Sequence, residues 1–196
     1  MPKAKPAADA QPTLAFASSR ELDRWLARNH ASASGLWIRL AKAGSGTKSV
    51  SYAEAVEVAL CWGWIDGQKK SLDDTAWLQR FTPRGPKSIW SKINREKAQA
   101  LIAAGRMQAP GLAEVERAKK DGRWEAAYDS PRSAEVPEDL RVALKKDKKA
   151  AAFFETLDRA NRYSILFRLH HAKKPETRAR KIGEFVAMLA RGEKLH

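Results

Sequence analysis

The residues best suited to recognition or catalysis lie within one stretch of the chain, Cys61–Asn94. This stretch holds four of the seven tryptophans, a glycine-flanked acid and a Thr-Pro-Arg turn. Aromatic rings supply contact area and the polar groups between them orient a ligand, so this composition is typical of a recognition surface. The candidate ligand-binding residues are Trp64, Asp66, Arg84, Lys87, Trp90, Ser91 and Asn94.

Asp66 is the candidate catalytic residue, because it follows Trp64-Ile65 and precedes Gly67. A carboxylate beside aromatic rings at the edge of a strand could serve as a general acid or base. The alternative is a structural aspartate that hydrogen-bonds the neighbouring turn. We expect no metal and no cofactor, since the chain has one cysteine and no His-Glu-x-x-His motif.

The segment from Thr82 to Ser88 places two cations, Arg84 and Lys87, just before a predicted helix. It is not a phosphate loop of the Walker type, because Pro86 interrupts the Gly-Lys pair and Phe81 stands where the first glycine belongs. The N–H groups and the dipole at the start of the helix nevertheless favour an anion. The alternative is a capped helix with ordinary basic side chains.

Trp90 and Asn94 are four residues apart, so they share one face of the predicted helix, and Ser91 lies on an adjacent face. Trp90 could stack on a ring of a ligand while the amide of Asn94 hydrogen-bonds the edge of that ring. The alternative interpretation places Trp90 in the hydrophobic core.

An α+β fold is predicted to position these residues, with a small antiparallel sheet of about three strands packed against helices. The strands are expected at residues 36–42, 64–72 and 77–82. Helices are expected from two capping boxes, Ser18–Glu21 and Ser51–Glu54, from Ser88 or Ser91 to Gly105, and from Pro110 or Gly111 to Lys120.

The predicted organisation is a disordered, basic Ala/Pro-rich tail over residues 1–13, a tryptophan-rich α+β domain over residues 14–130 and a helical lobe over residues 137–196. The linker between the last two is rich in serine and proline. In the lobe, apolar residues at i, i+3, i+4 and i+7 predict an amphipathic helix after Pro175.

Charge and composition limit the partners. The chain has 37 Lys and Arg against 23 Asp and Glu, so its net charge is 37 − 23 = +14, and residues 140–196 are its most basic segment. This balance favours an anionic small molecule, a protein partner or nucleic acid, although a solvated basic surface would have the same composition. The single cysteine, the lack of a secretory signal and the absence of any apolar run near the roughly 20 residues of a membrane span predict a cytoplasmic protein.

The chain resembles the YdeI/OmpD-associated family, also called bacteriocin-protection or OmdA-like proteins. The matching pieces include Leu22-Asp-Arg-Trp-Leu26, Gly35-Leu-Trp-Ile-Arg-Leu40, Ser51-Tyr-Ala-Glu-Ala55, Cys61-Trp-Gly-Trp-Ile-Asp-Gly67, Ser88-Ile-Trp-Ser-Lys-Ile-Asn94, Gly122-Arg-Trp124 and Glu176-Thr-Arg178. The resemblance implies a bacterial protein linked to tolerance of antimicrobial peptides or bacteriocins, with no defined reaction. The leading hypothesis is a cytosolic tolerance factor that binds an anionic ligand or partner among these tryptophans. The alternatives are a small-molecule enzyme that uses Asp66 as its base, and nucleic-acid binding by the basic lobe.

Overall fold

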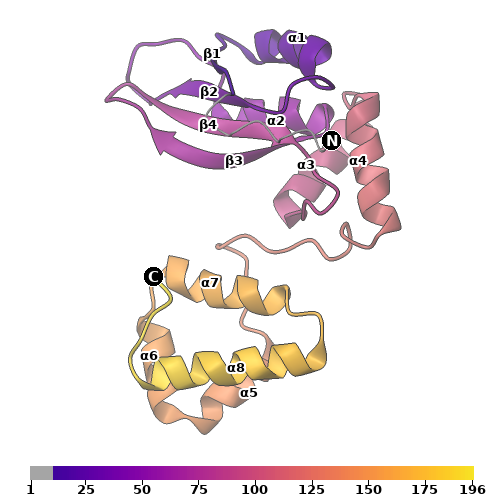
Figure 1. The fold of residues 1–196 in the computed structure, drawn as a ribbon. Coiled ribbons are helices and arrows are strands. Elements are labelled where there is room, and N and C mark those ends of the chain that lie inside the picture. The colour runs from indigo at the N-terminus through magenta and orange to yellow at the C-terminus, as the bar shows by residue number, and fades with distance from the viewer. Residues whose placement is uncertain (1–10) are drawn as a thin grey trace, which may run out of the picture. The chain divides into compact units, whose positions relative to one another are not determined.

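The computed structural model describes residues 11–196, which divide into an N-terminal unit ending at Ala127 and a C-terminal unit starting at Tyr128 (Figure 1). The N-terminal unit contains β1 (Thr13–Ala15), α1 (Ser19–Asn29), β2 (Leu36–Ala41), α2 (Tyr52–Cys61), β3 (Trp64–Ser71), β4 (Ala76–Pro83), α3 (Lys92–Ala103) and α4 (Ala109–Lys120). The C-terminal unit contains α5 (Glu138–Lys146), α6 (Lys148–Thr156), α7 (Arg159–His170) and α8 (Pro175–Ala190). The predicted α+β class is confirmed.

The sheet has four strands in the order β1-β2-β4-β3, so the predicted count of about three is wrong by one. The additional strand, β1, pairs in parallel with β2, whereas the other pairs are antiparallel. It has only three residues, too few for an alternating pattern, and it forms because β2 offers it an edge. The predicted tail lies mostly outside the described residues, and its residue Thr13 already belongs to β1.

Alternation along β2 determines which side chains enter the core. Leu36, Ile38 and Leu40 are fully buried and face the helices, as the period-2 pattern predicts. Trp37 points to the opposite face of the sheet, yet only 4% of it is exposed. The ammonium of Lys70 on β3 lies 4.6 Å from the centre of its ring, so an aliphatic stem and a cation cover this tryptophan.

Helix α2 is buried along most of its length and begins at a complete capping box. The Ser51 hydroxyl accepts from the Glu54 N–H at 3.2 Å, and the Glu54 carboxylate accepts from the Ser51 N–H at 2.9 Å. These hydrogen bonds hold the pKa of Glu54 below its ordinary value of 4.5. The hydrogen bond with the Ser51 side chain has the larger effect, and the one with the Ser51 backbone the smaller.

Glu54→Gln is therefore expected to reduce the loss of stability in acid. Because the folded-state pKa is depressed, the carboxylate's contribution is fully present above pH 4.5 and is lost as pH falls through the folded pKa. Urea unfolding at neutral pH and in mild acid should show a smaller pH difference for this variant than for the parent. Glu96→Gln, which removes an exposed glutamate from α3, is the control. An unchanged difference in Glu54→Gln would contradict the prediction.

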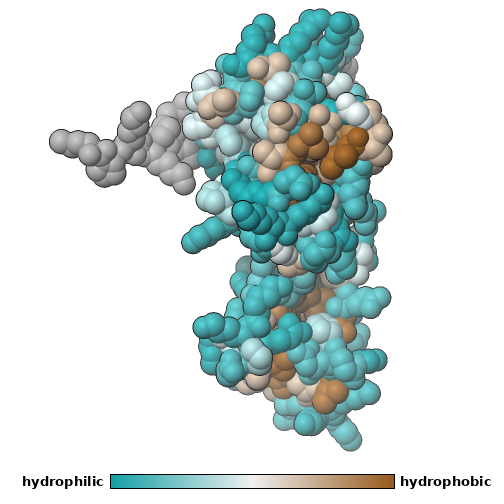
Figure 2. All heavy atoms as spheres, turned by 90° about the vertical axis from the view of Figure 1, so that its right-hand side faces the viewer, coloured by the Kyte–Doolittle hydropathy of each residue, from teal (hydrophilic) through white to brown (hydrophobic). Residues whose placement is uncertain are grey.

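The C-terminal unit has its own hydrophobic core, formed by one face of each of its four helices. Its most deeply buried side chains are Leu140, Ala150, Phe154, Ile165 and Leu169, together with Leu189 from the predicted amphipathic helix α8. No helix within residues 11–196 is long and apolar enough to cross a bilayer. Hydrophilic side chains cover most of the face of each unit that Figure 2 shows, which suits the net charge of +14.

Candidate functional site

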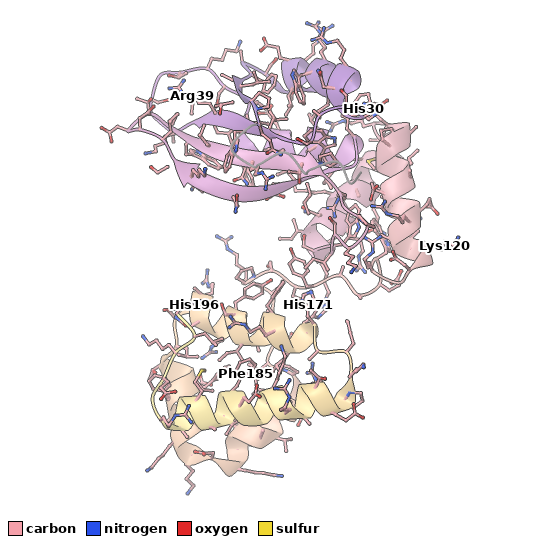
Figure 3. The ribbon with its side chains drawn as sticks, viewed as in Figure 1. His30, Arg39, Lys120, His171, Phe185 and His196 are labelled. Carbon is pink, nitrogen blue, oxygen red and sulfur yellow. The ribbon has the colours of Figure 1, made fainter. Side chains whose placement is uncertain are left out.

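Trp64 is a core residue of the N-terminal unit. It is 1% exposed, and its ring packs edge-to-face on Trp25 with centroids 6.0 Å apart. Its indole Nε1–H donates to the carbonyl of His30 at 3.3 Å, just after α1 (His30 is labelled in Figure 3). Both the apolar ring and the polar edge of Trp64 are therefore engaged within the fold.

Asp66 lies on β3 opposite Phe81 of β4, immediately before an irregularity in the pairing of these strands. The aspartate is half-exposed, and its Oδ2 accepts a hydrogen bond from the hydroxyl of Tyr52 at 2.6 Å. Tyr52 is the first residue of α2, so this bond joins the start of α2 to β3. The arrangement gives Asp66 a structural partner.

Arg84 and Trp90 form the centre of the candidate site. The Arg84 guanidinium lies 3.6 Å from the centre of the Trp90 ring, and its Nη1 donates to the carbonyl of Ile89 at 3.3 Å. Arg84 is 5% exposed and Trp90 is 1% exposed, so the stack is buried. A buried cation over an indole face is a strong form of the cation–π interaction. We call the segment that this stack closes, residues 84–90, the arginine loop.

Two further arginines, Arg117 of α4 and Arg123 after it, hold the arginine loop from outside. Arg117 Nη2 donates to the carbonyls of Arg84 and Gly85 at 3.4 and 3.1 Å, and Arg123 Nη1 donates to the carbonyl of Ser88 at 2.6 Å. Lys120, the last residue of α4, lies between Arg117 and Arg123 in the sequence and is labelled in Figure 3. Three guanidinium groups therefore surround one short loop.

Two acids, Glu114 and Asp121, pair with arginines of this cluster. Asp121 binds Arg123 at 2.7 Å, and Glu114 pairs with Arg117 through a side chain that is only 17% exposed. Burial raises the pKa of Glu114, and the positive charges of Arg117, Arg84 and Arg123 act in the opposite direction. Three guanidinium groups thus face two carboxylates, Glu114 and Asp121, so the cluster keeps an excess of one positive charge.

Trp90 Nε1 and Arg117 Nε are buried N–H donors at the cluster, and neither has an acceptor within residues 11–196. Most buried donors in folded proteins are satisfied, because an unsatisfied one costs the desolvation energy of the group. Trp64 shows the ordinary case in this same fold, since its Nε1 has a carbonyl acceptor. Each of these two donors therefore lacks the partner that the Trp64 indole has.

The remaining predicted residues lie in the arginine loop and at the start of α3. Lys87 is exposed, Asn94 is half-exposed, and the hydroxyl of Ser91 accepts from the Asn94 N–H at 3.1 Å as the N-cap of α3. The structure thus brings Arg84 and Trp90 into contact beside the start of α3. It places Trp64 and Asp66 on β3, where their side chains have other partners.

The arginines Arg117 and Arg123, with Glu114, are the site residues that sequence reasoning missed. They lie about 30 residues beyond the loop that they hold, and no local pattern connects them to it. No group of three or more His, Cys, Asp or Glu side chains within residues 11–196 could hold a metal ion. Burial raises the pKa of the Cys61 thiol, which disfavours the reactive thiolate.

The fold and the site define a protein of two units, an α+β unit with an arginine–tryptophan cluster and a helical unit. Residues 14–114 match a family described as a domain of unknown function, DUF8412, and residues 133–192 match the family described as bacteriocin-protection, YdeI or OmpD-associated. The first match covers more than half of the chain, which therefore belongs to the DUF8412 family, and the second shows that the C-terminal unit is similar to the YdeI/OmpD-associated family. No curated protein and no solved structure matches the chain.

The second match confirms the resemblance predicted from the sequence, but it assigns that resemblance to a different part of the chain. Most of the motifs that suggested the family lie between Leu22 and Trp124. Of those motifs, only Glu176-Thr-Arg178 lies within the matched residues 133–192. The tryptophan-rich motifs belong instead to the segment that matches DUF8412 or follow it closely.

Proposed function

We propose that this chain is a bacterial, cytosolic tolerance factor for bacteriocins or other antimicrobial peptides, and that it acts by binding a small anion or the anionic group of a larger ligand. The description of the family that its C-terminal unit matches supports the biological role. The arginine loop of the N-terminal unit supports the chemistry, because three guanidinium groups gather there with only two carboxylates, Glu114 and Asp121.

One observation carries this proposal: the fully buried Trp90 Nε1–H has no acceptor among the described residues, although the Arg84 guanidinium lies over the same ring. A carbonyl or a water molecule would satisfy the donor, but neither would offset the excess positive charge. An anion does both, since charge-assisted hydrogen bonds from indole and guanidinium N–H groups are shorter and stronger than neutral ones. The exposed Lys87 in the same loop would attract such a ligand.

The decisive experiment compares two tryptophans. Melting temperatures of the parent, Trp90→Phe and Trp64→Phe are measured while sodium phosphate replaces sodium gluconate at constant ionic strength. An anion that binds only the native state stabilises it by about 2.7 kcal/mol at 100 times its Kd. We expect a concentration-dependent rise for the parent and Trp64→Phe, and a much smaller rise for Trp90→Phe, which lacks the unsatisfied donor.

Trp64→Phe is a matched control, because both substitutions shrink a fully buried indole and only Trp90 lacks an acceptor. Equal rises in all three proteins would mean a nonspecific salt effect and would reject the proposal. So would the absence of any rise in the parent with phosphate, sulfate and chloride in turn.

The two alternative functions have less support. Asp66 accepts a hydrogen bond from the Tyr52 hydroxyl and lies opposite Phe81 of β4, and neither of these residues belongs to the arginine loop. In the basic lobe, many arginine charges are already neutralised by acids of the same unit. The pairs are Arg141–Glu138, Arg162–Glu155, Arg178–Asp139, Arg180–Glu184 and Arg191–Glu193. Fewer cations are therefore available to a nucleic acid, whose affinity depends on phosphate contacts.

A further inference from the structure

The C-terminal unit contains a pocket of about 220 Å³ between the segment that precedes α5 and the helices α7 and α8. Its wall is formed by three aromatic rings, Tyr128, Tyr163 and Phe167, by two acids, Asp129 and Glu135, and by polar groups from His170 and Arg178. None of these residues belongs to the arginine loop, so this pocket is independent of the proposed anion site.

The three rings form the corner of a cage. Tyr128 and Phe167 lie 5.1 Å apart at an interplanar angle of 85°, and Tyr163 and Phe167 lie 5.8 Å apart at 47°. Rings that meet at large angles present faces in different directions, so a group inside the corner contacts more than one π-face. Cages of this kind bind organic cations, because the face of an aromatic ring carries a negative partial charge.

The charges on the wall favour the same kind of ligand. Arg178 does not offset the two acids, because Asp139, which lies outside the wall, already binds it through two hydrogen bonds of 2.5 and 3.0 Å. The third nitrogen of its guanidinium donates to the carbonyl of Leu169 at 2.6 Å. The wall thus presents two carboxylates, Asp129 and the exposed Glu135, in a protein whose net charge is +14.

Tyr163 is held in the wall by a hydrogen bond and carries no charge. Its hydroxyl donates to the carbonyl of Asp129 at 2.8 Å. Burial raises the pKa of Tyr163 to about 12, and the neighbouring Tyr128 and Asp129 act in the same direction. The phenol therefore stays neutral at physiological pH. Tyr163 therefore contributes a neutral ring to the wall.

From the aromatic corner and its two carboxylates, we infer that this pocket binds an organic cation of side-chain size, an ammonium or guanidinium group on a short alkyl chain. Drug-sized ligands need roughly 300–1,000 Å³, and this pocket is smaller. A lysine or arginine side chain of a peptide partner has the right size, with its alkyl stem on the rings and its charge beside Glu135 and Asp129.

The test uses the full chain, with the methyl NMR signals of two wall residues, Ala134 and Leu166, as reporters. The probes are Nα-acetyl-lysine amide, Nα-acetyl-arginine amide and butylammonium, compared with the neutral Nα-acetyl-norleucine amide and the acidic Nα-acetyl-glutamate amide. The titrations run at pH 8, where an ordinary histidine is neutral. We expect saturable chemical-shift changes with the three cationic probes. A larger affinity for the lysine and arginine probes than for butylammonium would identify a peptide as the natural source of the cation.

Glu135→Gln is the informative variant, because Glu135 is exposed and its replacement leaves the core intact. Removal of one partly exposed charge should weaken the lysine probe about two- to fivefold. Glu184→Gln, which removes the same charge from α8 outside the pocket, should leave the affinity unchanged. The inference would be overturned if the norleucine probe bound equally well or if the glutamate probe bound more tightly. It would also be overturned if neither methyl signal shifted at ~50 mM, a concentration above the Kd of even a millimolar site.

Discussion

Phe154→Ala is expected to lower the free energy of unfolding of the C-terminal unit by about 3–5 kcal/mol. Phe154 is 1% exposed in the centre of that unit's core, and the guanidinium of Arg162 lies 4.7 Å from the centre of its ring. Removal of the ring leaves a cavity that the surrounding helices fill only in part. It also deprives the Arg162 charge of its aromatic contact.

The neighbouring residue, Phe153, supplies the control, because it lies on the same helix but is only partly buried. Phe153→Ala should cost roughly 1–2 kcal/mol, since less apolar area is lost from the core. Urea unfolding followed by far-UV circular dichroism measures both variants. All seven tryptophans lie between residues 25 and 124, so their fluorescence reports the N-terminal unit separately. Equal losses in the two variants would show that burial in this core does not set the cost.

Gly111→Ala is expected to destabilise the N-terminal unit by about 3 kcal/mol, the upper part of the range for overpacking. A Cβ at this position of α4 would lie 2.3 Å from the carbonyl oxygen of Cys61, at the end of α2. Both groups belong to backbone segments, so no side chain can rotate away. The same carbonyl accepts from the Gln108 N–H at 3.1 Å, and any movement of α4 that relieves the clash would strain this bond.

Gly183→Ala is the matched control and should have the opposite sign. Gly183 is exposed in α8, and a Cβ there would meet no atom within 4 Å. Alanine is favoured over glycine in a helix by roughly 0.5–1 kcal/mol, so the variant should be more stable than the parent. Tryptophan fluorescence during urea unfolding measures the loss in Gly111→Ala, and circular dichroism measures the gain in Gly183→Ala. A Gly111→Ala protein as stable as the parent would show that α4 does not need this close approach.

The features that the sequence determined by itself are those that depend on neighbours in the chain. Ser51 and Glu54 form the predicted capping box because the hydrogen bonds join residues three apart. The alternation of β2 and the apolar spacing of α8 identified the side chains that enter the cores, since each periodicity decides which side chains share a face, but alternation did not predict the burial of Trp37. These local rules were sufficient for the α+β class and for the position of the main helices.

The tertiary structure alone decided the features that depend on contacts between distant segments. The strand β1 exists through its parallel pairing with β2, and the cluster at the arginine loop exists because α4 brings Arg117 to residues more than 30 positions earlier. Trp64 and Trp90 look alike in the sequence, but only the packed fold gives one an acceptor and leaves the other without one. The aromatic pocket likewise combines Tyr128 with Phe167, which no spacing rule connects, because a pocket is defined by packing.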